Sequence, residues 1–191
     1  MKRLMTVGPR QCEVVEVDMP ELEEDRILLK TRAVSVLMEN VGLHTGADPR
    51  LKAPGNSLYR GYPLPQAGEA IAEVVEVGAD VEGVRVGERF VTYTTYDEYR
   101  VVAPDAWPKV AARVRDETAI SLPFSGTTLH CTRRAKVEIG DDVAIIGQGP
   151  MGVLVTQWVR LAGAGRVIAG DLNSKRLEIS REMGATHTVD G

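Results

Sequence analysis

The chain has 191 residues, of which 43% are hydrophobic and 26% are charged, and its formal net charge at pH 7 is −4. This length predicts one or two domains with a real hydrophobic core. A nucleic-acid-binding protein normally has a basic excess, whereas here 27 acidic residues outnumber 23 Lys and Arg. No apolar stretch approaches the length of a membrane span, and the N-terminus has no signal-peptide core. We therefore predict a soluble, cytoplasmic protein that has neither a nucleic acid nor a membrane as its partner.

Short runs of β-forming residues, separated by Gly, Pro and Asp, fill the first part of the chain. Residues 42–62 form an irregular stretch between them. Many short strands at close spacing predict an antiparallel barrel or sandwich, which we place at residues 1–115. The expected strands are Glu13–Val17, Arg26–Val36, Ile71–Val77, Arg89–Tyr93 and Tyr96–Val102.

The pattern changes at Asp116, where helices begin to alternate with apolar strands, so residues 116–191 form a second predicted domain. One or two helices are expected over 116–136, with Pro123 and Gly126 as interruptions. Continuous apolar runs are typical of parallel strands buried on both faces. Such strands are expected at 143–146 and 167–171, helices at 151–162 and 174–183, and the start of a third strand at Thr186.

A glycine-rich turn, Gly147-Gln148-Gly149-Pro150-Met151-Gly152, follows the first of these strands and opens the next helix. In this context Gly147 allows a tight turn, Gly149 lets the backbone approach a pyrophosphate, and Gly152 lets the helix pack closely on the strand. The first turn of the helix, which contains Pro150 and Met151, offers N–H groups and a positive dipole to phosphate. The alternative is a turn whose glycines serve packing only.

Asp171 ends the second strand, 19 residues after Gly152. A carboxylate at this position can accept hydrogen bonds from both hydroxyls of the adenosine ribose. It would repel a 2′-phosphate, so NAD is favoured over NADP. Lys175 and Arg176 lie slightly further along and could soften that preference.

These features together resemble the medium-chain dehydrogenase/reductase superfamily, the relatives of zinc alcohol dehydrogenase. The segments that carry the resemblance are the glycine-rich turn, Glu73–Gly78, Val86–Val91 and Glu182–His187. The resemblance implies an α/β protein with a β-rich domain: a GroES-like N-terminal β-barrel, the catalytic domain, followed by the first part of a Rossmann parallel α/β sheet.

The chain departs from the zinc-containing members of that superfamily. Their zinc ligands align with Leu37, Gly68 and Pro123, none of which can bind a metal, and only Glu69 remains. A catalytic zinc needs three protein ligands, so we predict no catalytic zinc. The cysteine cluster of the structural zinc site is missing too. The loop is similar to a zinc-free branch, which includes bacteriochlorophyllide dehydrogenases, through Ser35 and Glu39.

Without zinc, other groups must stabilise the developing charge and move a proton. The candidates are Glu39, Asn40, His44 and Glu69, which face the cofactor cleft in the fold that the resemblance implies. For Glu39 the alternative is a role in orienting the loop, and for His44 it is a plain surface-loop histidine. His130 is expected to pack in a helix. Cys12 and Cys131 match no disulfide or zinc spacing and are expected to be buried.

The sequence leaves two functions open. The first is a zinc-independent, NAD-linked oxidoreductase that transfers a hydride to or from an alcohol, a ketone or an activated alkene. The second is a non-catalytic nucleotide-binding or interaction protein. Because the chain stops at the start of a third parallel strand, we also expect a truncated form of a longer dehydrogenase with little activity of its own. A homodimer of the full-length form is left open.

Overall fold

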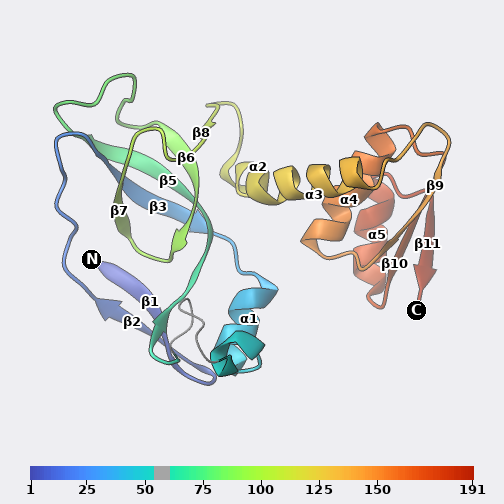
Figure 1. The fold of residues 1–191 in the computed structure, drawn as a ribbon, viewed down its shortest axis with the longest axis horizontal. Coiled ribbons are helices and arrows are strands. Elements are labelled where there is room, and N and C mark those ends of the chain that lie inside the picture. Colours follow the sequence, from blue (N-terminus) through green and yellow to red (C-terminus); the bar gives the residue numbers. More distant parts are fainter. Residues whose placement is uncertain (54–60) are drawn as a thin grey trace. The chain divides into compact units, whose positions relative to one another are not determined.

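The computed structural model describes residues 1–53 and 61–191, and the chain divides into two compact units (Figure 1). The first unit is Met1–Ile120 and the second is Ser121–Gly191. The division of the structure therefore falls between Ile120 and Ser121. Within the described residues, no helix has the length and apolar character needed to cross a membrane.

The first unit contains two antiparallel sheets. The larger sheet has the strand order β7-β3-β5-β6-β8 and the smaller one β2-β1-β4. The strands of the larger sheet are β3 (Ile27–Val34), β5 (Ala67–Val77), β6 (Arg89–Thr95), β7 (Tyr99–Val102) and β8 (Lys109–Val110). Those of the smaller sheet are β1 (Lys2–Gly8), β2 (Gln11–Glu16) and β4 (Leu64–Pro65).

The larger of the buried clusters of the first unit lies on one face of the larger sheet, and a second cluster with Ile71 and Val91 lies on the other. Successive residues of a strand point to opposite faces, so apolar residues two positions apart reach the same side. On β3 these are Ile27 and Leu29, which are fully buried and pack with Val74 of β5 and Phe90 of β6. The predicted strand positions are close to those observed, but β1, β4 and β8 were not expected from the sequence.

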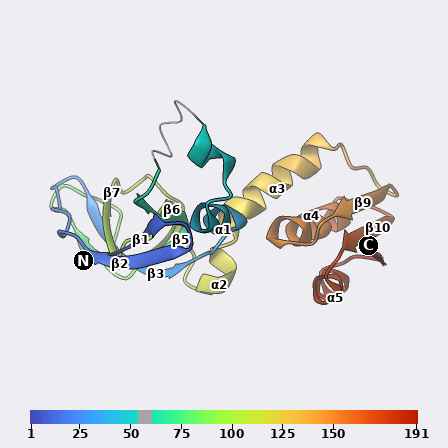
Figure 2. The same ribbon diagram turned by 90° about the horizontal axis from the view of Figure 1, so that it is seen from below.

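A short helix that the sequence did not indicate, α1 (Met38–Thr45), follows β3 and lies beside β1 (Figure 2). It ends where Gly46 adopts a left-handed conformation with φ of +76°. A 3₁₀ turn, η1 (Pro49–Lys52), comes next. The irregular stretch predicted at 42–62 is therefore partly helical, and its residues 54–60 lie outside the described residues. The four-residue helix α2 (Asp116–Ala119) closes the unit.

The second unit is a parallel sheet with helices. Its strands have the order β11-β10-β9 and are β9 (Asp142–Ile146), β10 (Arg166–Asp171) and β11 (His187–Asp190). The helices are α3 (Leu122–Arg134), α4 (Pro150–Leu161) and α5 (Ser174–Glu182). Figure 1 shows α4 and α5 beside the three parallel arrows. Together with the antiparallel sheets, this architecture confirms the predicted fold class.

The prediction that β9 is buried on both faces is wrong for this structure. Val143 and Ile145 point to the side where α4 packs, and they join a core with Val159 and Val167. The alternate residues point away, and Ile146 is 87% exposed. One face of the sheet is thus covered and the other is bare.

Several smaller expectations also fail. Pro123 does not interrupt a helix but begins one, because a proline in the first turn lacks only an N–H that needs no partner there. Gly126 lies inside that same helix, α3. Cys12 and Cys131 are exposed rather than buried. His130 is exposed as well, because Thr128 and Thr132 take the buried positions of α3.

Candidate functional site

The glycine-rich turn connects β9 to α4 with geometry that only glycine allows at two positions. Gly147 has φ of +88°, in the left-handed region that side chains disfavour. A Cβ atom on Gly152 would lie 1.9 Å from the Gly147 carbonyl oxygen. At Gly149, which precedes the first turn of α4, a Cβ atom would meet nothing within 4 Å. The fold itself thus requires glycine at positions 147 and 152, whereas Gly149 faces open space.

The buried side chain of Gln148 stabilises this turn through hydrogen bonds. The sequence did not reveal this role, because the position looked like a spacer between glycines. Its side chain is 1% exposed, and its amide nitrogen donates to the Ile145 carbonyl over 3.1 Å. Its amide oxygen accepts from Thr156 of α4 at 3.1 Å and from Ser180 of α5 at 2.8 Å. One buried amide therefore ties a strand and two helices to the turn.

Asp171 lies at the end of β10, and its carboxylate faces the turn. One oxygen, Oδ2, accepts from the Gln148 backbone N–H over 2.6 Å, and Oδ1 accepts from Asn173 N over 2.9 Å. These bonds, with the nearby Arg176 guanidinium 3.7 Å from Oδ2, hold the pKa of Asp171 below its usual value. The carboxylate is therefore charged at neutral pH and fixed in place.

A hollow of about 920 Å³ opens beside Asp171 within the second unit. Its size is that of a typical small-molecule site. The residues that line it include Ile146, Gly147, Asp171, Leu172, Asn173 and Arg176.

The other residues predicted to bind the cofactor surround the same turn. Pro150 and Met151 form the first turn of α4. The backbone N–H groups of Lys175 and Arg176 both donate to the side chain of Asn173, which caps α5. The structure therefore gathers the predicted cofactor residues into one region of the second unit.

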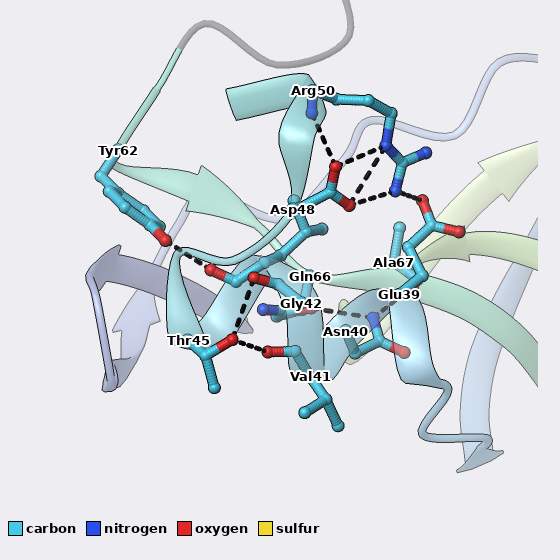
Figure 3. Close-up of polar contacts among 11 residues, drawn as sticks. Glu39, Asn40, Val41, Gly42, Thr45, Asp48, Arg50, Tyr62, Gln66 and Ala67 are labelled. Atoms are coloured by element: carbon cyan, nitrogen blue, oxygen red, sulfur yellow. Dashed lines mark hydrogen bonds and ion pairs between the residues drawn. The ribbon is translucent and has the colours of Figure 1, made fainter. Parts of the chain in front are cut away.

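The predicted catalytic residues all lie in the first unit, and three of them are on α1. Glu39 forms an ion pair with Arg50, in which Glu39 Oε1 is 2.8 Å from Arg50 Nη2. The same guanidinium binds Asp48 and keeps the pKa of Asp48 low. Figure 3 shows Arg50 between the two carboxylates. Glu39 thus helps to hold the turn η1 against α1.

Asn40 is buried and fully hydrogen-bonded. Its Nδ2 donates to Gln66 Oε1 at 2.8 Å and to the Ala67 carbonyl at 2.7 Å (Figure 3). Its Oδ1 accepts from Leu37 N at 2.8 Å and lies 3.0 Å from the hydroxyl of Tyr96. These contacts connect α1 to β5 and account for every polar atom of the amide.

Glu69 on β5 is a buried carboxylate, 4% exposed, whose Oε2 accepts from Ser35 Oγ over 2.8 Å. The hydroxyl of Tyr96 lies 2.5 Å from the Ser35 carbonyl. A Cβ atom on Gly68 would be 2.5 Å from the same hydroxyl. Tyr96 therefore fills the space that any larger side chain at position 68 would need.

The titration of Tyr96 gives a testable consequence of this packing. Burial and the nearby Glu69 raise the pKa of Tyr96 to about 12, from about 10 in an unfolded chain. Because the folded protein holds this proton more tightly, the resulting stabilisation is complete below about pH 10 and lost as the pH rises towards 12. We expect Tyr96→Phe to flatten this part of the pH dependence of the unfolding free energy, with Tyr99→Phe as the control. An unchanged slope would contradict the assignment.

His44 lies in the last turn of α1 rather than in a surface loop, so that expectation is wrong. Its Nδ1 atom is 3.2 Å from the sulfur of Cys12 on β2. His44 therefore has a cysteine thiol as its partner, which the sequence did not suggest. Cys12 and His44 lie far apart along the chain, and only the pairing of β1 with β2 beside α1 brings them together.

The residues present do not fit a catalytic zinc. Position 37 is a leucine that precedes α1, and position 68 is a glycine without room for a side chain. Pro123 lies in the first turn of α3. Across residues 1–53 and 61–191, no three His, Cys, Asp or Glu side chains gather as metal ligands would.

Comparison with known proteins finds dehydrogenases, some of which are named as zinc-binding. No protein-family model matches the chain. It is 25% identical to a sorbitol dehydrogenase of Bacillus subtilis strain 168, covering 100% of this chain and 61% of the relative. The likeness to dehydrogenases of the medium-chain dehydrogenase/reductase type thus extends over the whole chain. This confirms the superfamily predicted from the sequence, whereas the zinc-free branch stays a prediction.

Solved structures support the same fold. One, described as a short-chain alcohol dehydrogenase of Escherichia coli CFT073 in complex with NADH, has a TM-score of 0.81 at 21% identity and covers 100% of this chain and 62% of its own. Another, a zinc-dependent alcohol dehydrogenase 2 from Streptococcus pneumonia, has a TM-score of 0.77 at 23% identity and covers 100% and 61%. The chain thus spans about three fifths of the length of the superfamily members it matches.

Proposed function

We propose that this protein binds NAD(H) and acts as a zinc-independent oxidoreductase that transfers a hydride to or from an alcohol, a ketone or an activated alkene. The observation that carries the proposal is the pairing of the glycine-rich turn with Asp171. A charged carboxylate is fixed 2.6 Å from the Gln148 N–H, beside a helix N-terminus with free space at Gly149. These are the groups that a dinucleotide needs.

Each part of the cofactor has a candidate partner. The first turn of α4, after Gly149, would bind the pyrophosphate through its N–H groups. Asp171 would accept hydrogen bonds from the adenosine ribose, and its charge would disfavour a 2′-phosphate. When bound, the nicotinamide would supply the hydride acceptor or donor. The names of the relatives, such as sorbitol dehydrogenase, support an alcohol as the substrate class.

Proton transfer would rest on residues of the first unit. Glu69 and Ser35 bring a buried carboxylate and a hydroxyl within 2.8 Å of each other. Such a pair can hold or pass a proton. Zinc independence is supported by the missing ligands at Leu37 and Gly68, although one of the similar structures is named as zinc-dependent.

The test combines turnover with metal content. We expect the full-length form to oxidise NADH with some member of a panel of ketones, aldehydes and enones, at a rate unchanged after dialysis against a chelator. Metal analysis of the same sample should find far less than one zinc per chain, because only Glu69 remains of the ligand positions.

Two results would contradict the proposal. Stoichiometric zinc that survives dialysis would show that other residues bind the metal. NADH binding without turnover of any compound would favour the non-catalytic nucleotide-binding protein instead.

A further inference from the structure

Cys12 and His44 form a thiol–imidazole pair that the proposed function does not use. The sulfur is 3.2 Å from His44 Nδ1, and Cys12 is exposed. A histidine at this distance can take the thiol proton, which leaves the thiolate, the reactive form of cysteine. His44 lies in the last turn of α1.

A chain of buried hydrogen bonds ends on the same sulfur. Its direction is fixed by two backbone groups that bind Asn40: the Leu37 N–H can only donate, and the Ala67 carbonyl can only accept. Asn40 must therefore present its NH₂ group to Gln66, and Gln66 must then present its own NH₂ group to Thr6 Oγ1.

Thr6 Oγ1 accepts that hydrogen bond, so its own proton remains to be donated. Among the described residues, the partner that remains for it is the Cys12 sulfur, at 3.6 Å. The two residues are paired across β1 and β2, which places their side chains on the same face. The sulfur of Cys12 therefore contacts both the Thr6 hydroxyl and the His44 imidazole.

A small apolar hollow of about 180 Å³ adjoins the pair. Cys12 and His44 are among the residues that line it, together with Leu4, Val36, Asn40, Val41, Gln66 and Tyr96. Its volume is below that of an ordinary drug-sized site. A compound of a few heavy atoms without charge suits such a space.

From these contacts we propose that Cys12 is a covalent-modification site for small, uncharged α,β-unsaturated carbonyl compounds, with His44 as its base. The proton moves from Cys12 Sγ to His44 Nδ1, and the sulfur bonds to the β-carbon of the compound. The electron pair of the carbon–carbon double bond shifts to the α-carbon, which takes the proton back from His44. The product is a thioether, and no other reactant is needed.

Cys131 provides an internal control, because it is the only other cysteine of the chain and is also exposed. Its sulfur has no hydrogen-bond partner among the residues that the structure describes. The probe is acrylamide, and the rate of modification at each cysteine is followed by peptide mass spectrometry. We expect Cys12 to react about tenfold faster than Cys131, or more, in the folded protein. In guanidinium chloride the two rates should converge.

Two variants distinguish proton abstraction by His44 from a hydrogen bond between His44 and the Cys12 sulfur. His44→Ala removes the base, whereas His44→Asn keeps a hydrogen-bonding group near the position of Nδ1 but cannot take a proton at neutral pH. Both should lower the Cys12 rate to near that of Cys131, while circular dichroism and chemical denaturation of each variant check that the first unit is still folded. Equal rates of the two cysteines in the unmodified chain would overturn the proposal. So would a fast Cys12 reaction that persists in His44→Asn.

Discussion

Replacing Gly149 with alanine is expected to leave the fold intact and to weaken NADH binding by about 10- to 100-fold. The φ angle of Gly149 is −71°, which alanine adopts freely, and its Cβ atom would meet nothing within 4 Å. The free energy of unfolding should therefore change by less than about 1 kcal/mol. The new methyl group would instead occupy the space where we place the pyrophosphate. Loss of one charge-assisted hydrogen bond accounts for the expected weakening.

Gly152→Ala is the matched control, because it alters the same turn for a different reason. Its Cβ atom would lie 1.9 Å from a backbone carbonyl oxygen, so the turn must open. We expect a loss of about 3 kcal/mol or more in the unfolding free energy. Chemical denaturation measures the unfolding free energy of both variants, and NADH fluorescence titration measures their affinity for the cofactor. If Gly149→Ala binds NADH normally, the glycine serves the turn alone and no phosphate lies there.

The second unit was largely predictable because its sequence signals are local. Apolar runs at 143–146 and 167–171 became β9 and β10, and the helices followed at the expected positions. The exposed face of β9 does not follow from the apolar run itself. An apolar run indicates that a strand can be covered on both faces, but it does not reveal what covers it.

The first unit was harder to predict, for two reasons. Helix α1 contains Gly42 and Asn40, which favour other conformations, and it is held in place by long-range contacts such as that of Asn40 with Gln66. The Cys12–His44 contact likewise depends on strand pairing that no local motif announces. Gln148 was overlooked because a consensus describes its glycines and treats the residues between them as spacers.

Asp171→Ser is expected to reverse the cofactor preference. The serine keeps one oxygen near the Gln148 N–H but removes the negative charge and one acceptor. NADH binding should weaken by about 10- to 100-fold, as for the loss of a charged hydrogen-bond partner. NADPH binding should improve, since the carboxylate no longer repels the 2′-phosphate. Isothermal titration of both cofactors measures the ratio. The control is Asp190→Ser. Asp190 lies opposite Asp171 in the strand register of β10 and β11, and its replacement should leave both affinities unchanged.

Arg176 provides a second test of the expected change in preference from NADH to NADPH. Its guanidinium lies 3.7 Å from Asp171 Oδ2, so removal of the carboxylate leaves a cation beside the position of the 2′-phosphate. Arginine binds phosphate well because its donors match the phosphate oxygens. The gain in NADPH binding should therefore disappear in the double variant Asp171→Ser/Arg176→Ala, while NADH binding stays as weak as in Asp171→Ser. If Asp171→Ser binds both cofactors as the unmodified chain does, the ribose does not lie at the end of β10.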